Sequence, residues 1–204
     1  MAAYDFENNA HDDSCNGWDG QVHGSPHFVT NTPASISGAY CVGQFSDADY
    51  ISLPPALLGS MASTGSVEIS FFHPYQNYGF GPNSVETLLE STGTFGVFRI
   101  SVGIGGFPQV DIPSQSSNFE IRSTTAIFTG RPYHFVFSYS GSSYAFYARD
   151  LSTQTDTLLF SGTAPSTIDL SGSGSLYVGH EATPGYYCAD YVDSLVFHNQ
   201  ALSG

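Results

Sequence analysis

The stretch GYYCADYVDSLVFHNQALSG, from Gly185 to Gly204, carries the clearest strand signal in this sequence. Apolar and polar side chains alternate with a period of two through residues 191–198, and β-branched and aromatic residues are frequent there. Both sides of the alternation carry large apolar groups, so we expect a central strand covered on both faces, with Asp193 near its start. The early segment AAYDFE, Ala2–Glu7, alternates in the same way, and we expect it to pair with this strand.

Further strand signals recur about every ten residues, and turn residues separate nearly all of them. We expect strands at 26–30, 40–45, 49–53, 66–73, 85–91, 95–102, 107–112, 118–122, 132–140, 144–150, 157–161 and 175–178. Only a short helical turn is expected, at Pro55–Met61. This pattern predicts one all-β domain over residues 1–204, built as an antiparallel β-sandwich of two sheets.

The charge balance disfavours several classes of partner. Lysine is absent, and four arginines face 18 acidic residues, which gives a formal net charge of −14. Nucleic acids and anionic lipids need basic side chains, so we expect no nucleic-acid binding and no membrane insertion. No apolar run approaches the roughly 20 residues that span a bilayer, and MAAYDFENN does not resemble a signal peptide. Cations are the natural partners of such a chain, although the acidity is also explained by a soluble, self-repelling surface.

The three cysteines, Cys15, Cys41 and Cys188, permit at most one internal disulfide. No CxxC pair is present, which argues against a structural zinc site. Two interpretations stay open. Either all three are buried reduced thiols, or one bridge forms, for which Cys41 with Cys188 is the preferred pair.

An acidic, turn-rich segment follows the first strand: NNAHDDSCNGWDGQVHG at Asn8–Gly24, called the opening loop below. Carboxylate and amide oxygens are the ligands that Ca²⁺ prefers, and glycine allows the tight turns that surround an ion. The spacing is not that of an EF-hand. From these residues alone, solvated turn residues and a Ca²⁺ site both remain open.

A second segment, PYQNYGFGPN at Pro74–Asn83, is rich in Gly, Pro and Asn and also carries aromatic rings. Exposed rings stack on the apolar faces of sugars while amide side chains bind hydroxyl groups, so one interpretation is a glycan site. Its candidate residues are Tyr75, Asn77, Tyr78 and Phe80. The alternative is that the rings fold back over the edge of the sandwich as a small satellite core.

Catalytic signatures are absent from the sequence. The nearest acidic pair, Glu86 and Glu90, would share one face of an extended strand at about 13 Å, beyond the roughly 5–9.5 Å of glycoside hydrolases. There is no GxSxG motif, and the absence of lysine excludes a Walker A loop and Schiff-base chemistry. The seven histidines lack metal-ligand spacing. We therefore expect no enzymatic activity, with a glycoside hydrolase or lyase as the remaining alternative.

Three stretches together resemble laminin-G-like domains of the concanavalin A-like lectin and glucanase superfamily. They are YDFENNAHDDSCNGWDGQVHG near the start, FSDADYISLP after it, and VDSLVFHNQALSG at the end. The resemblance implies a two-sheet jelly roll with a structural Ca²⁺ between the opening loop and the closing strand, held by Asp13, Asn16, Asp19 and Asp193. Cys15 and Ser46 depart from the family pattern, which usually has Ser or Gly and Asp at these positions.

The resemblance also implies a non-catalytic, lectin-like recognition or adhesion module that binds a glycan or glycoprotein on an extracellular or virion surface. The competing interpretation is a structural decoration or fibre protein of a virus or phage particle, which would contact capsid or fibre proteins or form a homo-oligomer. An assembly protein should bury large apolar patches in symmetric contacts, whereas a lectin should expose an aromatic groove with polar groups.

Overall fold

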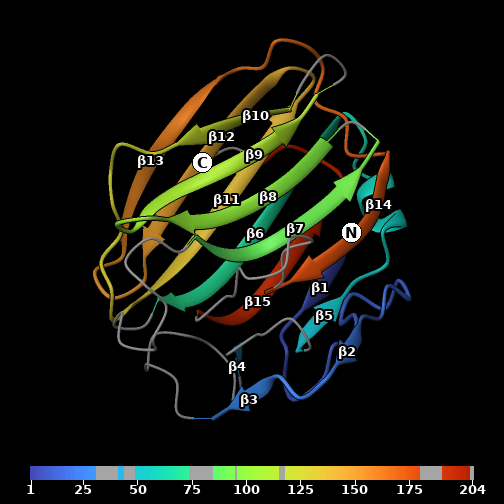
Figure 1. The fold of residues 1–204 in the computed structure, drawn as a ribbon, viewed down its shortest axis with the longest axis vertical. Coiled ribbons are helices and arrows are strands. Elements are labelled where there is room, and N and C mark those ends of the chain that lie inside the picture. The colour runs from blue at the N-terminus through green and yellow to red at the C-terminus, as the bar shows by residue number, and fades with distance from the viewer. Residues whose placement is uncertain are drawn as a thin grey trace.

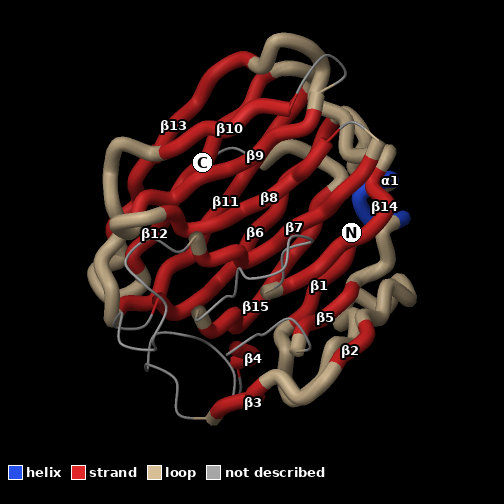
Figure 2. Tube along the Cα trace, in the orientation of Figure 1, coloured by secondary structure: helices blue, strands red, loops and turns tan. Residues whose placement is uncertain are grey.

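The computed structural model describes residues 1–30, 41–43, 49–73, 85–94, 96–114, 118–179 and 190–202. Two β-sheets lie face to face, with β7–β10 in front of β6, β11 and β12 in Figure 1. A four-residue helix, α1 (Ala56–Gly59), lies beside β14 at the edge of the molecule (Figure 2). The predicted fold class, an all-β sandwich of two antiparallel sheets, is therefore confirmed. Within the described ranges, no helix has the length and apolar character needed to cross a bilayer.

One sheet has eight strands, and all its pairings are antiparallel. In spatial order its strands are β13 (Thr155–Thr163), β12 (Ser143–Asp150), β11 (Arg131–Ser140), β6 (Thr64–His73), β15 (Tyr191–His198), β4 (Cys41–Gly43) and β3 (His27–Val29), and β1 (Ala2–Tyr4) also pairs with β15.

The other sheet has seven strands and is also antiparallel throughout. Its order is β10 (Asn118–Arg122), β9 (Phe107–Pro113), β8 (Gly96–Gly103), β7 (Glu86–Gly93), β14 (Ser173–Val178), β5 (Tyr50–Ser52) and β2 (Gln21–His23). Strand β2 was not predicted, because its three residues lie in the glycine-rich opening loop.

Aromatic rings and branched aliphatic side chains fill the core between the sheets. Phe71 on β6 meets Phe135 on β11 edge to face, with 4.7 Å between ring centroids. Phe98 on β8 reaches across from the other sheet to Phe137 on β11 at 5.6 Å. Burial of each such ring contributes about 1.5–3 kcal/mol. These contacts hold the two sheets together.

The pairing and the central position of β15 agree with the prediction for the closing strand. It pairs with β1 through Ala2 and Phe197, and it lies inside the sheet between β6 and β4. Its core-facing Leu195 and Phe197 are fully buried, whereas the side chains of its opposite face are half-buried: Ser194, Val196 and His198. The expectation of full cover on both faces was thus only partly correct, because no second sheet packs on that face among the described residues.

A β-bulge in β7 changes how the side chains of Glu86 and Glu90 are oriented relative to each other. The pairing register with β8 shifts between Thr87 and Leu89. As a result, Glu86 lies opposite Val102 and Glu90 lies opposite Arg99. Val102 is buried in the core. Residues directly opposite in an antiparallel pair share a face, and Val102 and Arg99 are three positions apart on β8. Glu86 and Glu90 therefore point to opposite faces of β7, and the expectation that they share one face was wrong.

The structure describes the side chain of one of the three cysteines, Cys15. Cys15 is exposed, with its backbone in the left-handed region at φ 61°, so the interpretation of three buried thiols was wrong for this residue. The Cys41 side chain and Cys188 lie outside the described residues.

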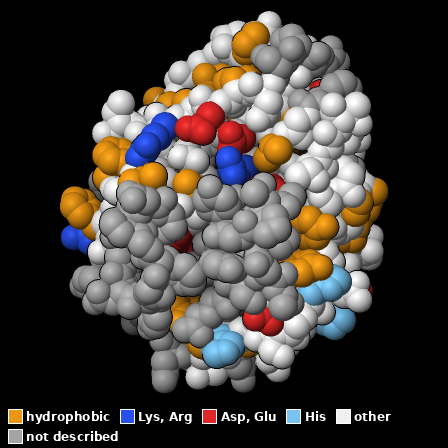
Figure 3. Space-filling view, in the orientation of Figure 1, with side chains coloured by type: hydrophobic (Ala, Val, Ile, Leu, Met, Phe, Trp, Pro, Cys, Tyr) orange, Lys and Arg blue, Asp and Glu red, His pale blue; other side chains and the backbone are white. Residues whose placement is uncertain are grey.

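Each arginine of the chain has a hydrogen-bonding partner in the fold. Figure 3 shows basic and acidic side chains next to one another on the face that carries β7–β10. On β8, the Arg99 guanidinium lies 2.6 Å from an Asp111 oxygen and 3.8 Å from a Glu90 oxygen. The other three are also held: Arg131 by Asp150, Arg149 by Asp156, and Arg122 by the carbonyl of Ile104. The few cations of this acidic chain thus have established contacts.

Candidate functional site

A groove of about 410 Å³ opens on the outer face of the eight-stranded sheet, and we call it the sheet groove. Two rows of paired residues form its floor. Glu68, Val136 and Tyr147 lie side by side on β6, β11 and β12, and His134 and Arg149 form the next row. Its lining is completed by Ala148, Asp156, Leu158 and Leu202. The alternation of β6 and β11, with Val67, Ile69, Phe135 and Phe137 on the core side, sends these polar residues outward.

Glu68 is the electrostatic centre of the sheet groove. One of its oxygens accepts a hydrogen bond from His134 Nε2 at 2.9 Å, and the other accepts one from His198 Nε2. His134 Nδ1 lies 2.9 Å from the Ser70 hydroxyl, so both nitrogens of this ring are engaged. The hydrogen bond from His134 is the main cause that lowers the pKa of Glu68 below its usual value. Glu68 is therefore an anchored carboxylate.

Arg149 and Asp156 form a two-pronged ion pair at the outer end of the groove. Arg149 Nε donates to Asp156 Oδ1 at 2.6 Å, and a terminal nitrogen donates to Oδ2 at 2.8 Å. Hydrogen bonding to Asp156 raises the pKa of Arg149, and the same contact lowers the pKa of Asp156. The side chains are 47% and 64% exposed, so both groups remain accessible to a ligand.

The C-terminal tail bounds the sheet groove at its other end. The Ser138 hydroxyl donates to the Leu202 carbonyl, and the Leu202 amide donates to the Ser66 hydroxyl, both at 2.9 Å. Ser66 also donates to the carbonyl of Gln200. These bonds fix the tail across β6 and β11, so Leu202 becomes an apolar wall.

The groove combines apolar surface with charged hydrogen-bonding groups of both signs. Leu158 is 53% exposed, and Tyr147 is half-buried. Flat or aliphatic surfaces flanked by a few fixed polar groups are typical of sites for neutral polar ligands. This site was not predicted, because its residues come from four strands and a tail that only the sheet order brings together.

The opening loop is folded around the carboxylate of Asp12, which was not among the predicted ligands. Its Oδ1 accepts from the amides of Ala3 and Ser14, both at 3.0 Å, and its Oδ2 from those of Asn16 at 3.2 Å and Trp18 at 3.1 Å. Burial acts to raise the pKa of Asp12, but these hydrogen bonds outweigh it and lower the pKa to about 2. One buried anion thus organises the whole turn.

The predicted calcium ligands are placed as follows. Asp13 is an exposed residue. Its pKa is raised by partial desolvation of the carboxyl group and by the nearby Asp5 carboxylate. Asn16 is exposed and donates from its amide to the Met1 carbonyl at 3.0 Å. Asp19 is exposed and accepts from the Asp12 amide at 2.9 Å, whereas Asp193 is 2% exposed on β15. Calcium at these residues stays a prediction.

The predicted sugar-binding residues of the aromatic segment are Tyr75, Asn77, Tyr78 and Phe80. All four lie outside the described residues. Their role stays a prediction, independent of the sheet groove.

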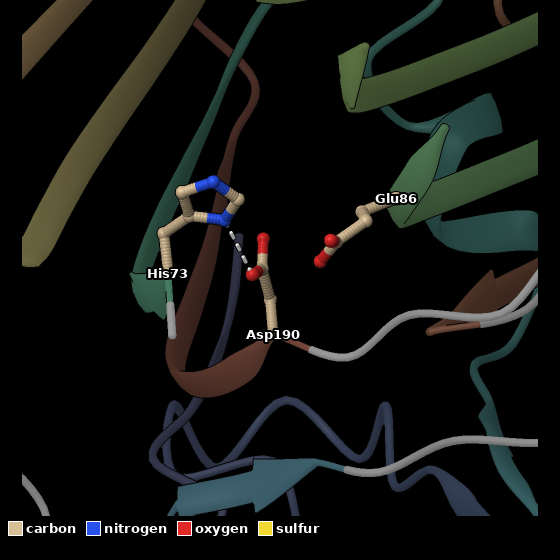
Figure 4. A group of neighbouring side chains, drawn as sticks. All are labelled: His73, Glu86 and Asp190. Carbon is tan, nitrogen blue, oxygen red and sulfur yellow. Dashed lines mark hydrogen bonds and ion pairs between the residues drawn. The ribbon is translucent and has the colours of Figure 1, made fainter. Parts of the chain in front are cut away.

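A second polar group lies between the two sheets and consists of His73, Glu86 and Asp190, which we call the buried triad. Figure 4 shows the His73 ring hydrogen-bonded to Asp190, with the Glu86 carboxylate directed at Asp190 from the opposite side. His73 Nδ1 lies 2.8 Å from Asp190 Oδ1, and these two side chains are 1% and 0% exposed. Burial acts to lower the pKa of His73, but the Asp190 carboxylate outweighs it and raises that pKa.

Part of the buried triad could be anticipated from the sequence. The alternation Val67, Ile69, Phe71 predicts that His73 also faces the core. The orientation of Glu86 follows from the bulge in β7, and the place of Asp190 follows from the pairing of β15 with β6. Neither feature has a clear sequence signal.

A scan against known family models finds no match, and no curated protein is significantly similar in sequence. The fold, by contrast, resembles many solved structures. Domain 4 of AbnA, a GH43 extracellular arabinanase from Geobacillus stearothermophilus solved with arabinotriose, matches with a TM-score of 0.71 and 19% identity. The match covers 99% of this chain and 93% of that one.

Two further structures illustrate the range of similar proteins. The CBM40 domain of Ruminococcus gnavus IT-sialidase, bound to α2,3-sialyllactose, matches with a TM-score of 0.61 and 14% identity over 80% of this chain and 91% of that chain. Botulinum neurotoxin type C, whose cell entry depends on interaction with two ganglioside molecules, matches with a TM-score of 0.67 and 10% identity. This chain is covered in full but spans only 48% of the toxin chain. These likenesses establish the β-sandwich fold, while the laminin-G-like resemblance stays a prediction.

Proposed function

We propose that this protein is a non-catalytic carbohydrate-binding domain that holds a neutral glycan in the sheet groove. The observation that carries the proposal is the composition of the groove, in which the Tyr147 ring and exposed Leu158 lie beside the fixed polar groups of Glu68, His134 and Arg149. Apolar side chains can cover the C–H faces of a sugar, and the polar groups can bind its hydroxyls. The sugar-binding structural neighbours support the same function.

A neutral ligand is favoured because the charges of the groove are already paired. Arg149 uses two donors on Asp156, so an anionic sugar would have to compete with that carboxylate. A sugar hydroxyl instead can add to the outer edge of each ion pair without separating it.

The same pairing supports a binding role over hydrolysis. A glycoside hydrolase needs one carboxyl group that keeps its proton near neutral pH, which requires a raised pKa. The pKa values of Glu68 and Asp156 are both lowered by their cationic or hydrogen-bonding partners. Glu86 and Glu90, on opposite faces of β7, do not form a catalytic pair either.

The test is a glycan array followed by calorimetry on the best neutral ligand. Replacing Tyr147 with Ala should weaken binding about tenfold, which corresponds to about 1.4 kcal/mol. Phe128→Ala is the matched control, because Phe128 is 64% exposed and lines a separate depression with Arg131 and Tyr133. Equal losses in the two variants, or none in either, would remove the groove from the proposal.

A structural calcium ion in the opening loop is part of the proposal. The pKa of Asp13 is raised in part by the nearby carboxylate of Asp5, and a cation would relieve that repulsion. An extracellular location agrees with the extracellular origin of the arabinanase domain. Light scattering at several concentrations separates this module from a particle protein, since a closed homo-oligomer would favour the latter.

A further inference from the structure

The buried triad joins three strands that belong to both sheets. His73 is the last residue of β6 and Glu86 the first of β7, while Asp190 immediately precedes β15. One nitrogen or oxygen from each residue lies within 4.8 Å of the corresponding atoms of the other two. The three ligand atoms thus converge on one point between the sheets, as Figure 4 shows.

Polar atoms of all three triad side chains are shielded from solvent, although the Glu86 side chain as a whole is not fully buried. His73 and Asp190 are almost fully buried, and Oε2 of the half-buried Glu86 is also out of contact with water. His73 Nε2 is buried without a hydrogen-bond partner among the described residues, so the polar contact of this ring is made through Nδ1, toward the carboxylates. Burial of this kind strengthens any interaction between the triad and an added charge.

The possible metal ligands of the triad are two carboxylates and one imidazole. Buried charged groups in proteins are paired or coordinate metal ions. A divalent cation with a neutral imidazole would bring the summed charge of these three side chains and the ion to zero.

We propose that His73, Glu86 and Asp190 form a binding site for one divalent metal ion of the zinc class. An imidazole nitrogen with two carboxylate oxygens is a ligand set that Zn²⁺ accepts, whereas Ca²⁺ and Mg²⁺ favour oxygen ligands alone. Ligand atoms around tetrahedral Zn²⁺ lie roughly 3.4 Å apart, given bonds of about 2.0–2.1 Å. This spacing lies between the two distances seen at the triad. His73 Nδ1 is 2.8 Å from Asp190 Oδ1, and all three ligand atoms lie within 4.8 Å of one another.

The ion would connect the sheets. His73 ends β6 and Asp190 precedes β15, the neighbouring strand of the eight-stranded sheet, whereas Glu86 belongs to the seven-stranded sheet. Gly43 keeps β4 close to this point, since a Cβ there would lie 2.8 Å from the Asp190 carbonyl. The site is distinct from the sheet groove and from the opening loop, so it does not depend on glycan binding.

The experiment titrates Zn²⁺ into protein that has been freed of metal with a chelator. Calorimetry should give one tight site, and the melting temperature should rise by about 5–10 °C at 100 times the dissociation constant. Glu86→Gln keeps the shape of the side chain and leaves the His73–Asp190 hydrogen bond in place. This variant should bind Zn²⁺ about 100-fold more weakly.

Two controls complete the test. Glu120→Gln changes an exposed glutamate on β10 of the same sheet and should bind as the wild type does. Asp13→Asn, in the opening loop, should also leave Zn²⁺ binding unchanged. The proposal is overturned if the wild type takes up no Zn²⁺, if Glu86→Gln binds it as tightly as wild type, or if Ca²⁺ binds the triad more tightly than Zn²⁺.

Discussion

The opening loop and the buried triad are both built around buried carboxylates, but they satisfy them differently. Asp12 receives four backbone amide hydrogen bonds from its own loop and the first strand. Asp190, in contrast, faces the His73 ring across two strands and has a second carboxylate, Glu86, beside it. Hydrogen bonds from nearby backbone amides stabilise the negative charge of Asp12. The contact of Asp190 comes instead from His73, a side chain that is distant in sequence.

This difference shows that a concentration of acidic residues in the sequence is a poor guide to where carboxylates gather inside the fold. The opening loop is rich in acidic residues, yet its central carboxylate, that of Asp12, already accepts four hydrogen bonds from backbone amides. The two carboxylates of the triad are far apart in the sequence and come together only in the folded protein.

The largest effect should follow from Asp190→Ala in metal-free protein. It removes the charged partner of a His73 side chain that is 1% exposed. Breaking one side of a buried ion pair costs about 3–5 kcal/mol, to be measured as the change in free energy of unfolding in urea. Asp156→Ala, which breaks the exposed pair with Arg149, should cost no more than about 1 kcal/mol. Similar losses in the two variants would contradict the buried character of the triad.

Asp12→Ala should have the next largest effect, about 2–4 kcal/mol, because hydrogen bonds to a charged acceptor contribute about 1.5–3 kcal/mol each and are not additive. Thermal unfolding measures the loss. The neighbouring Asp13→Ala should change stability by no more than about 0.5 kcal/mol, since Asp13 is exposed. If Asp13 matters as much as Asp12, the loop is not organised around one carboxylate.

Acid should abolish the advantage of Asp12 over a neutral isostere. Its folded-state pKa, about 2, lies below the ordinary value of 3.8. The ionised group therefore contributes stability above pH 3.8, and that contribution is lost as the pH falls toward 2. The gap in unfolding free energy between the wild type and Asp12→Asn should narrow over this interval, and a gap that stays constant would argue against the lowered pKa.

The smallest effect is expected from Ca²⁺ at the opening loop. At a concentration equal to its dissociation constant, a single ion adds only about 0.4 kcal/mol. Asp13→Asn and Asp19→Asn should each remove the resulting rise in melting temperature, because both carboxylates are exposed and available. A rise that persists in both variants would place the ion elsewhere.

The fold class and most of the strands can be predicted from the order of the residues. A period of two in β6, β11 and β15 reports a local property, the alternation of side chains across a pleated strand, so it can be recognised from the residues alone. The pairing of the first and last strands followed from their shared pattern and is confirmed by the register of Ala2 with Phe197. The composition of the opening loop likewise marked a turn rich in polar contacts.

Contacts between side chains from distant strands, in contrast, depend on how the sheets fold and pack. The bulge between Thr87 and Leu89 turned Glu86 into the core, and the order of β12, β11 and β6 put Tyr147, Val136 and Glu68 in one row. A one-residue change of register moves a side chain to the other face of a strand, and sheet order joins segments that are far apart in the chain. Both depend on the packing of the whole sandwich, which is why the sheet groove had no signature in the sequence and the triad had one only for the core-facing His73.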